Sequence, residues 1–265
     1  MPSSFELSPS LAHEALQAVR QAGEIILGQW SKPSDIRRKG PIDLVTETDL
    51  AVEEALKLSL ARILPGSTFL AEESAESLDP GELCWIIDPV DGTTNFAHRV
   101  PFVATSVALW QGGRTVLGIV NVPAMSECFH AVLGGGAFLN GEAIRVSSVE
   151  RLEDSLIATG FPYTVREDIR PLMDNLENML VSTQGVRRPG AASIDLAYTA
   201  AGRFDAFYET GLKPWDTAAG WLLVTEAGGR VSAFDASRPY WLRSRSILAS
   251  NGLVHEAVAA LLRED

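Results

Sequence analysis

The residues best suited to binding or catalysis lie in segment 85–96, which reads WIIDPVDGTTNF. Its apolar start predicts a buried strand that ends at Asp88, and a second carboxylate, Asp91, follows across Pro89. Two carboxylates held this close repel each other unless a cation lies between them. A hard cation with oxygen ligands fits, and the backbone carbonyl of Val90 offers one more ligand. We therefore expect a metal site at this strand end, where ligand sites of α/β sheets tend to lie.

The next residues suit a phosphate group. Gly92 lets a ligand approach the backbone closely. Thr93 and Thr94 begin a short helical turn, whose free N–H groups would bind an anion. A purely structural alternative needs the same residue types, namely an Asp-Gly turn followed by capping threonines. The segment alone leaves both interpretations open.

Further acids stand at the ends of predicted elements. Glu72 and Glu73 follow a short strand in LAEES, where an exposed acidic turn is the structural alternative. Asp49 lies in VTETDLAVEE, where it could simply cap a helix. Asp216 opens an apolar helix in KPWDTAAGWLLVTEAGG, where it would complement the helix dipole. Taken with the two acids of the first segment, the pattern favours two or more Mg²⁺ ions with open positions for water and phosphate oxygens.

The sequence lacks the motifs of several other kinds of functional site. No serine lies in a nucleophile-elbow sequence, and there is no P-loop and no dinucleotide fingerprint. Zinc is disfavoured because the histidines show no paired spacing and neither cysteine has a partner nearby. Those residues are His13, His98, His130, His255, Cys84 and Cys128.

Composition limits the partners. The chain has 265 residues and a formal net charge of −12, so nucleic acid is an unlikely ligand without a local basic patch. No apolar run is long enough to span a bilayer, and the N-terminus lacks a signal-peptide pattern. Two cysteines make no disulfide framework in a chain of this size. We expect reduced thiols, a cytoplasmic location and no membrane partner.

Periodicity and turn residues predict the elements. In the first part, a helix starts at Pro9 with Ser8 as its cap, 31–40 is a loop, and Gly134–136 is a turn. A second helix covers 48–64, and strands cover 68–71, 84–88, 105–110, 115–122 and 128–133. In the second part, strands at 156–159, 204–209, 231–234 and 247–250 alternate with helices at 166–181, 191–201, 217–227 and 254–263.

The change of pattern near Ser147 and Ser148 divides the chain into two halves. Residues 1–147 read as a helix pair plus an antiparallel sheet, and residues 148–265 as an α/β half. We expect one catalytic unit, with its site between the halves.

Five strings in this order carry a resemblance to a known family. They are DLVTETD (43–49), AEES (71–74), WIIDPVDGTTNF (85–96), WDTAAG (215–220) and VTEAGG (224–229). The chain resembles the inositol monophosphatase family, within the Mg²⁺-dependent, Li⁺-sensitive sugar phosphatases. The resemblance covers nearly the whole chain. It implies a layered αβαβα sandwich of the inositol monophosphatase and fructose-1,6-bisphosphatase type, in the mixed α+β or α/β class, and a homodimer.

The resemblance also implies a role for each matching position. Glu72, Asp88 and the carbonyl of Val90 would hold a first Mg²⁺. Asp88, Asp91 and Asp216 would hold a second, and Glu72 would share a third, weaker ion. Catalysis would rest on Thr93, hydrogen-bonded to Asp49, which orients and helps to deprotonate the attacking water, together with Glu72. Substrate contacts would come from Asp91, Gly92, Thr93, Gly190, Ala191, Ala192, Glu209 and Asp216. Lys39 would lie near the site.

The implied reaction is hydrolysis of inositol monophosphate or a similar small polyol or sugar phosphate by metal-activated water. The segment 93–96 resembles the inositol monophosphatase branch. Nucleotide and histidinol-phosphate phosphatases often carry lysine at the position of Thr94. Glu209 also suits a polyol hydroxyl better than a nucleotide phosphate. Fructose 1,6-bisphosphate, histidinol phosphate and nucleotide 3′-phosphates remain alternative substrates. A regulatory binding protein that retains the fold is the alternative of a different class.

Overall fold

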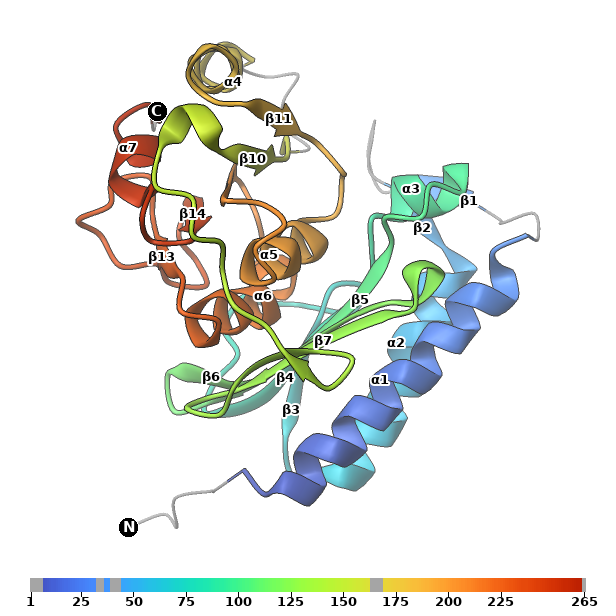
Figure 1. Cartoon of the computed structure of the whole chain (residues 1–265). Coiled ribbons are helices and arrows are strands. Elements are labelled where there is room, and N and C mark those ends of the chain that lie inside the picture. Colours follow the sequence, from blue (N-terminus) through green and yellow to red (C-terminus); the bar gives the residue numbers. More distant parts are fainter. Residues whose placement is uncertain (1–6, 32–35, 39–43, 163–168, 264–265) are drawn as a thin grey trace.

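The computed structural model describes residues 7–31, 36–38, 44–162 and 169–263. Helices and sheets stack in layers (Figure 1): α1 and α2, a large sheet, α5 and α6, a small sheet, and finally α4 and α7. Three groups of buried apolar side chains fill the spaces between successive layers. The layered αβαβα arrangement predicted from the sequence is therefore confirmed.

The large sheet has seven strands in the order β3-β4-β5-β6-β7-β8-β9. Only the β3–β4 pair is parallel. Alternate residues of β4 serve two cores: Trp85 and Ile87 pack with α1 and α2, whereas Cys84 and Ile86 pack toward α5 and α6. The strands are β3 Thr68–Ala71, β4 Leu83–Asp91, β5 Ala104–Gln111, β6 Arg114–Val122, β7 Glu127–Val132, β8 Gly136–Leu139 and β9 Glu142–Ala143.

The small sheet has five strands in the order β11-β10-β12-β14-β13. Strand β10 pairs in parallel with β11 and β12, and β14 runs antiparallel to β12 and β13. A separate two-stranded sheet joins β1 to β2. The strands are β1 Ile36–Arg38, β2 Leu44–Thr46, β10 Leu156–Thr159, β11 Gly185–Arg187, β12 Ala206–Thr210, β13 Arg230–Ser232 and β14 Ser246–Ser250.

The helices cover both faces of the large sheet. Within the described residues, no helix is both long and apolar enough to cross a bilayer. The α-helices are α1 Pro9–Gln29, α2 Glu47–Ile63, α3 Thr93–His98, α4 Arg170–Ser182, α5 Ala192–Ala200, α6 Pro214–Glu226 and α7 His255–Ala259, with 3₁₀ turns η1 Pro123–Met125 and η2 Leu152–Asp154.

Small residues allow the middle layer to approach its neighbours closely. A Cβ on Gly118 of β6 would lie 2.7 Å from the carbonyl oxygen of Ala219 on α6. A Cβ on Gly220 of α6 would overlap the side chain of Leu196 on α5. Helix α6 is thus pressed between the sheet and α5, which fixes the position of its N-terminus.

Several sequence predictions differ from the structure, among them the helix at 254–263, of which α7 covers only His255–Ala259. The expected loop at 31–40 contains β1, which pairs with β2. Strand β4 does not stop at Asp88 but continues to Asp91 through a register shift. Helix α6 begins at Pro214 and not at Thr217, because Pro214 suits the first helical turn. The predicted start of α4 at residue 166 falls outside the described residues, and the described helix begins at Arg170.

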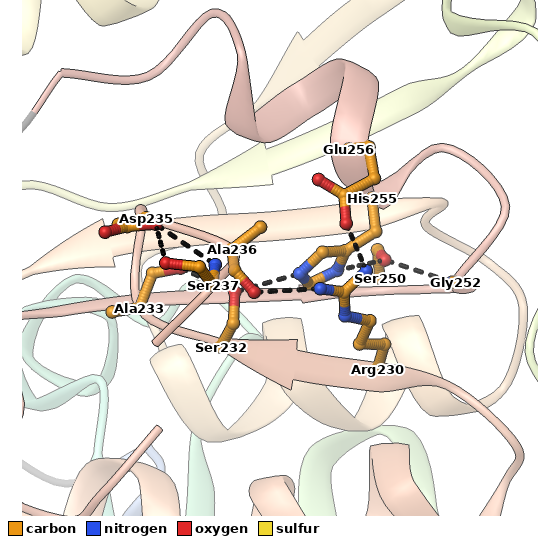
Figure 2. A network of polar contacts seen from close by, with 10 residues as sticks. All are labelled: Arg230, Ser232, Ala233, Asp235, Ala236, Ser237, Ser250, Gly252, His255 and Glu256. Carbon is orange, nitrogen blue, oxygen red and sulfur yellow. Dashed lines mark hydrogen bonds and ion pairs between the residues drawn. The ribbon is translucent and has the colours of Figure 1, made fainter. Parts of the chain in front are cut away.

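A buried histidine joins β13, β14 and α7 (Figure 2). The Nε2 of His255 lies 2.9 Å from the hydroxyl of Ser232, and its Nδ1 lies 2.8 Å from the hydroxyl of Ser250. Ser232 donates its own hydrogen to the carbonyl of Ala233, so it accepts from Nε2–H. Ser250 accepts from the N–H of Gly252 through one lone pair, and its hydroxyl hydrogen remains for Nδ1. These partners select the neutral imidazole.

Burial, reinforced by nearby Arg230, lowers the pKa of His255 to about 4. Glu256 opposes this shift but pairs with Arg230 at 2.6 Å. An unfolded histidine, with a pKa near 6.5, binds a proton before the folded one does. This residue therefore contributes stability above pH 6.5 that is lost as the pH falls toward 4.

We expect His255→Gln to flatten the pH dependence of stability. The variant should be less stable than the wild type at pH 7, yet lose less free energy of unfolding between pH 6.5 and pH 4.5. Urea denaturation across this range measures both effects. His13→Gln, which alters an exposed histidine on α1, is the control and should keep the wild-type slope. Equal slopes in His255→Gln and the wild type would contradict the assignment.

Candidate functional site

The two acids of the first segment flank a bulge in β4. Asp88 pairs with Ser106 of β5 and Asp91 pairs with Ala104, so the register shifts between them. Pro89 has no N–H for the ladder, and its carbonyl accepts instead from the hydroxyl of Thr105 at 3.0 Å. The bulge is thus held in place, and both carboxyl groups are buried.

Gly92 is required where β4 passes into α3. Its φ of 89° lies in the left-handed region, and a Cβ there would meet the carbonyl oxygen of Phe102 at 2.6 Å. The side chain of Asn95, one turn into α3, donates to the carbonyls of Phe102 at 2.8 Å and Pro189 at 2.9 Å. This amide connects α3 to the segment that leads into α5 at Gly190.

The hydroxyl of Thr93 lies between two acceptors. Its Oγ1 is 3.2 Å from a carboxylate oxygen of Asp49 and 3.1 Å from the carbonyl oxygen of Val90. Asp49 also accepts from the N–H of Thr46 at 2.9 Å and from its hydroxyl at 2.5 Å, because it is the third residue of a capping box. The capping alternative and the implied contact with Thr93 are therefore both present, although the cap itself is Thr46.

Glu72 begins the turn after β3. Its N–H donates to the carbonyl of Ile87 at 3.1 Å, which brings the turn beside β4. The next residues are held by a buried carboxylate on α2, Glu53, which accepts from the N–H of Glu73 at 2.9 Å and the hydroxyl of Ser74 at 2.5 Å. Lys57 pairs with Glu53 at 2.7 Å. The acidic turn is therefore a fixed element.

Asp216 is the third residue of α6, and its carboxylate accepts from the N–H of Lys213 at 2.6 Å. The helix start is tied to the large sheet because Ser106 of β5 donates to the carbonyl of Trp215 at 3.1 Å. The structural alternative for Asp216, a carboxylate at a helix N-terminus, is thus realised, and it also brings the residue beside β4.

The acids raise one another's pKa values. The pKa of Asp88 lies well above its usual value, first because of burial and then because of Glu72, Asp91, Asp216 and Asp49. Burial also raises the pKa of Asp216, and Glu72, Asp91 and Glu209 add to the shift. The structure therefore brings together the acids that the sequence singled out. In the described chain, no three such side chains form a ready-made coordination shell.

The start of α5 completes this region. Burial raises the pKa of Asp91 to about 6, against hydrogen bonds that lower it. The strongest come from Ser193, whose N–H and hydroxyl lie 2.7 and 2.5 Å from one oxygen of Asp91. Ala192 and Gly190 stand just before Ser193, and Gly190 has a φ of 93°. The sequence argument missed Ser193, although it directly follows the predicted Gly-Ala-Ala backbone.

Glu209 lies at the end of β12 and is buried. Its carboxyl group packs on Gly160, where a Cβ would overlap it. Burial raises its pKa to about 8; Arg188 opposes this shift and Asp91 adds to it. Asp195 of α5 lies within the same electrostatic environment, with one oxygen lacking a hydrogen-bond partner, and it was not predicted. Lys39 lies outside the described residues.

The donor set suits a hard cation. All the candidate ligands are oxygens, four from the carboxylates of Glu72, Asp88, Asp91 and Asp216 and one from the Val90 carbonyl. Buried carboxylates that repel one another would be stabilised by positive charge, and Arg188 supplies some of it to Glu209 and Asp195.

The chain is similar to known proteins over nearly its whole length. Inositol-1-monophosphatase of Mesorhizobium japonicum is 38% identical over 258 residues, which cover 96% of this chain and 97% of that protein. Nus factor SuhB of Pseudomonas aeruginosa is 43% identical over 258 residues, which cover 94% of each chain. The crystal structure of extragenic suppressor protein SuhB from Bartonella henselae superposes with a TM-score of 0.90 at 37% identity, over 96% of this chain and 99% of that one.

Fold, site and relatives together define a phosphatase with a layered α/β architecture. The sequence profile of the inositol monophosphatase family matches residues 9–265, and the chain belongs to that family.

We expect Glu53→Gln to weaken Mg²⁺ binding by about tenfold, the scale on which residues behind metal ligands act. The change loosens the turn that carries Glu72 but removes no candidate ligand. The Mg²⁺ concentration that gives half-maximal phosphatase activity measures the effect. Glu54→Gln alters the exposed neighbour on α2 and serves as the control. An unchanged Mg²⁺ requirement in Glu53→Gln would show that this clamp does not position Glu72.

Proposed function

We propose that the protein is a Mg²⁺-dependent, Li⁺-sensitive phosphomonoesterase that acts on inositol monophosphate or a similar small polyol phosphate. The observation that carries the proposal is the cluster of buried acids around the β4 bulge, with Thr93 hydrogen-bonded to Asp49 beside it. Acids that raise one another's pKa in this way are costly for a fold and are typical of sites that bind cations.

The proposed ligands fall into two overlapping sets. Glu72, Asp88 and the Val90 carbonyl would hold one Mg²⁺, and Asp88, Asp91 and Asp216 would hold a second, with a weaker third ion at Glu72. When bound, Mg²⁺ lowers the pKa of water and offsets charge on phosphate and leaving-group oxygens. In this proposal the site lies between residues 1–147, which supply the β4 acids, and residues 148–265, which supply Glu209 and Asp216.

Thr93 and Asp49 orient the attacking water. Two acceptors compete for the Thr93 hydroxyl hydrogen, the Asp49 carboxylate and the Val90 carbonyl, so the hydroxyl oxygen is held in a fixed position. Burial raises the pKa of Asp49, which makes it a better acceptor for a proton relayed through Thr93. The attack forms a new P–O bond as the ester P–O bond breaks, and the leaving alkoxide takes up a proton from water to give the free hydroxyl. The phosphate would rest on the backbone N–H groups of Gly92 and Thr93.

Polyol recognition falls to Glu209, with Asp91 and the Gly190–Ala192 backbone beside it. A carboxyl group with a pKa of about 8 is mostly protonated at neutral pH, so it both donates to and accepts from a hydroxyl group. Its position on Gly160 leaves little freedom to move. The relative from M. japonicum named inositol-1-monophosphatase supports a polyol substrate.

Phosphate release tests the proposal. We expect Mg²⁺-dependent and Li⁺-inhibited release from inositol 1-phosphate, in preference to fructose 1,6-bisphosphate, histidinol phosphate and adenosine 3′,5′-bisphosphate. Asp91→Asn should abolish turnover while retaining the circular dichroism spectrum, because it removes a ligand and leaves the core intact. Asp174→Asn alters an exposed acid on α4 and is the control.

The results separate the alternatives. Preferential release from another substrate of the panel would retain the mechanism and replace the substrate. Wild-type turnover in Asp91→Asn would contradict the two-metal assignment. No release from any of the four would favour a binding role, which the name Nus factor SuhB among the relatives makes the alternative to consider.

We also propose a homodimer formed through α4. Ile169, Met173 and Leu180 share one side of this helix by their spacing, and all three are exposed, as is Val181 at 79%. An exposed apolar stripe of this kind is typical of an interface.

Analytical ultracentrifugation should give about twice the chain mass of 28.6 kDa. We expect Met173→Glu combined with Leu180→Glu to produce monomers, because it puts two charges into the apolar stripe. Leu58→Glu, at an exposed leucine of α2, should remain dimeric. A monomeric wild type, or a dimer that survives the double change, would rule out this interface.

A further inference from the structure

A basic cavity lies beside the segment that connects β12 to α6. Its volume is about 650 Å³, within the range of small-molecule sites. The segment 210–214 forms one wall, and the loop that precedes β14 forms another. The cationic residues that line it are Lys213, Arg238, Arg243, Arg245 and Arg263.

The charge of this cavity runs against that of the molecule. The chain carries a net charge of −12, yet the described residues that line the cavity include no aspartate or glutamate. Asp235 neutralises part of the charge, since it pairs with Arg238 at 3.2 Å. Arg243 and Arg245 are exposed and form no ion pair with any residue that the structure describes. Within the described part of the chain, no carboxylate neutralises these two guanidinium groups, so they can bind an added anion.

The backbone that carries these arginines is fixed. Around Arg243, a tight turn is closed twice: Ser244 donates its N–H to the carbonyl of Trp241 at 2.8 Å and accepts from the N–H of Trp241 at 3.0 Å. Gly211 donates to the carbonyl of Arg245 at 2.8 Å, which joins the two walls. Leu242, which lies between Trp241 and Ser244 in the sequence, is buried. A ligand would therefore meet a largely formed site.

Arginine side chains suit phosphate groups in particular. Guanidinium groups bind phosphate oxygens in bidentate fashion, and several of them around one cavity match a ligand with more than one anionic group. The side chain of Arg263 is held in place by its hydrogen bonds to the carbonyls of Ala260 and Leu262, at 3.0 and 2.9 Å. Among the residues that the structure describes, its other guanidinium nitrogens have no hydrogen-bond partner.

We propose that this cavity binds a small molecule that carries two or more phosphate groups. The site is distinct from the acid cluster and needs no cation, so anion binding at the cavity does not depend on the phosphatase function, whereas the role of the cavity in substrate binding rests on the proposed function. It nevertheless adjoins the catalytic region, because the wall 210–214 runs from Glu209 toward Asp216, and the N–H of Lys213 holds the Asp216 carboxylate at 2.6 Å. The ligand is then either a separate effector or a substrate whose second phosphate reaches the cavity.

Isothermal titration calorimetry of the full-length, metal-free protein with fructose 1,6-bisphosphate tests the proposal. Without a cation the acid cluster repels phosphate, so binding reports the basic cavity. We expect Arg243→Gln combined with Arg245→Gln to raise the Kd at least tenfold and to leave the circular dichroism spectrum unchanged. Arg62→Gln combined with Arg114→Gln removes two exposed arginines elsewhere and should preserve the Kd.

The proposal fails if the bisphosphate does not bind the metal-free wild type, or if the Arg243 and Arg245 double variant binds as tightly as the control. Given binding, turnover with Mg²⁺ separates the two sources of ligand. A rise in KM for fructose 1,6-bisphosphate that exceeds the rise for inositol 1-phosphate identifies a second phosphate of the substrate. An unchanged ratio of the two KM values identifies a separate effector.

Discussion

Repulsion among buried carboxylates is the constraint around which this molecule is built. Asp88 is only 2% exposed, and four other acids act on it. In an interior of low dielectric constant such a group either takes up protons or requires positive charge nearby. A sheet end alone does not supply that charge. The surrounding fold has to hold the acids together against their repulsion, and in the proposed function a cation then offsets it.

Helix N-termini supply part of the missing charge. Asp49 of α2 and Asp216 of α6 occupy the same third position of their helices, and each accepts the N–H of the cap residue. Asp91 accepts from Ser193 at the start of α5. Three helices from two layers thus direct their positive ends at one cluster, which offsets carboxylate charge. For these acids, the structural and the functional explanations are the same geometry.

The sequence predicted those parts of the fold that depend on local pattern. The buried strand before Asp88 and the cap at Ser8 each follow from neighbouring residues. Strand β1 escaped prediction because three polar-flanked residues carry no periodicity and depend on pairing with β2. The bulge escaped for a related reason: Pro89 reads as a stop, yet β5 continues to pair beyond it through Ala104 and Asp91.

The candidate site shows the same division. Its acids could be named from motifs, whereas their supports could not, because Ser193 acts on Asp91 across 102 positions of sequence. Glu53 was within reach of prediction, since it lies one helical turn beyond Asp49 on the same buried face of α2. The arginines of the basic cavity come from segments that only the fold brings together. In the sequence alone they are indistinguishable from solvated surface charges.

The two charged regions also differ in what they require before binding phosphate. The acid cluster repels a phosphate until cations neutralise it, so in the proposed mechanism metal binding has to precede substrate binding. The basic cavity has no such requirement, because its own side chains supply positive charge. The segment 210–214 separates the two and contributes to both, through Lys213 on one side and its hydrogen bond to Asp216 on the other. A shift of this backbone on anion binding would change the position of a carboxylate in the cluster, which gives the two regions a direct physical route for influencing each other.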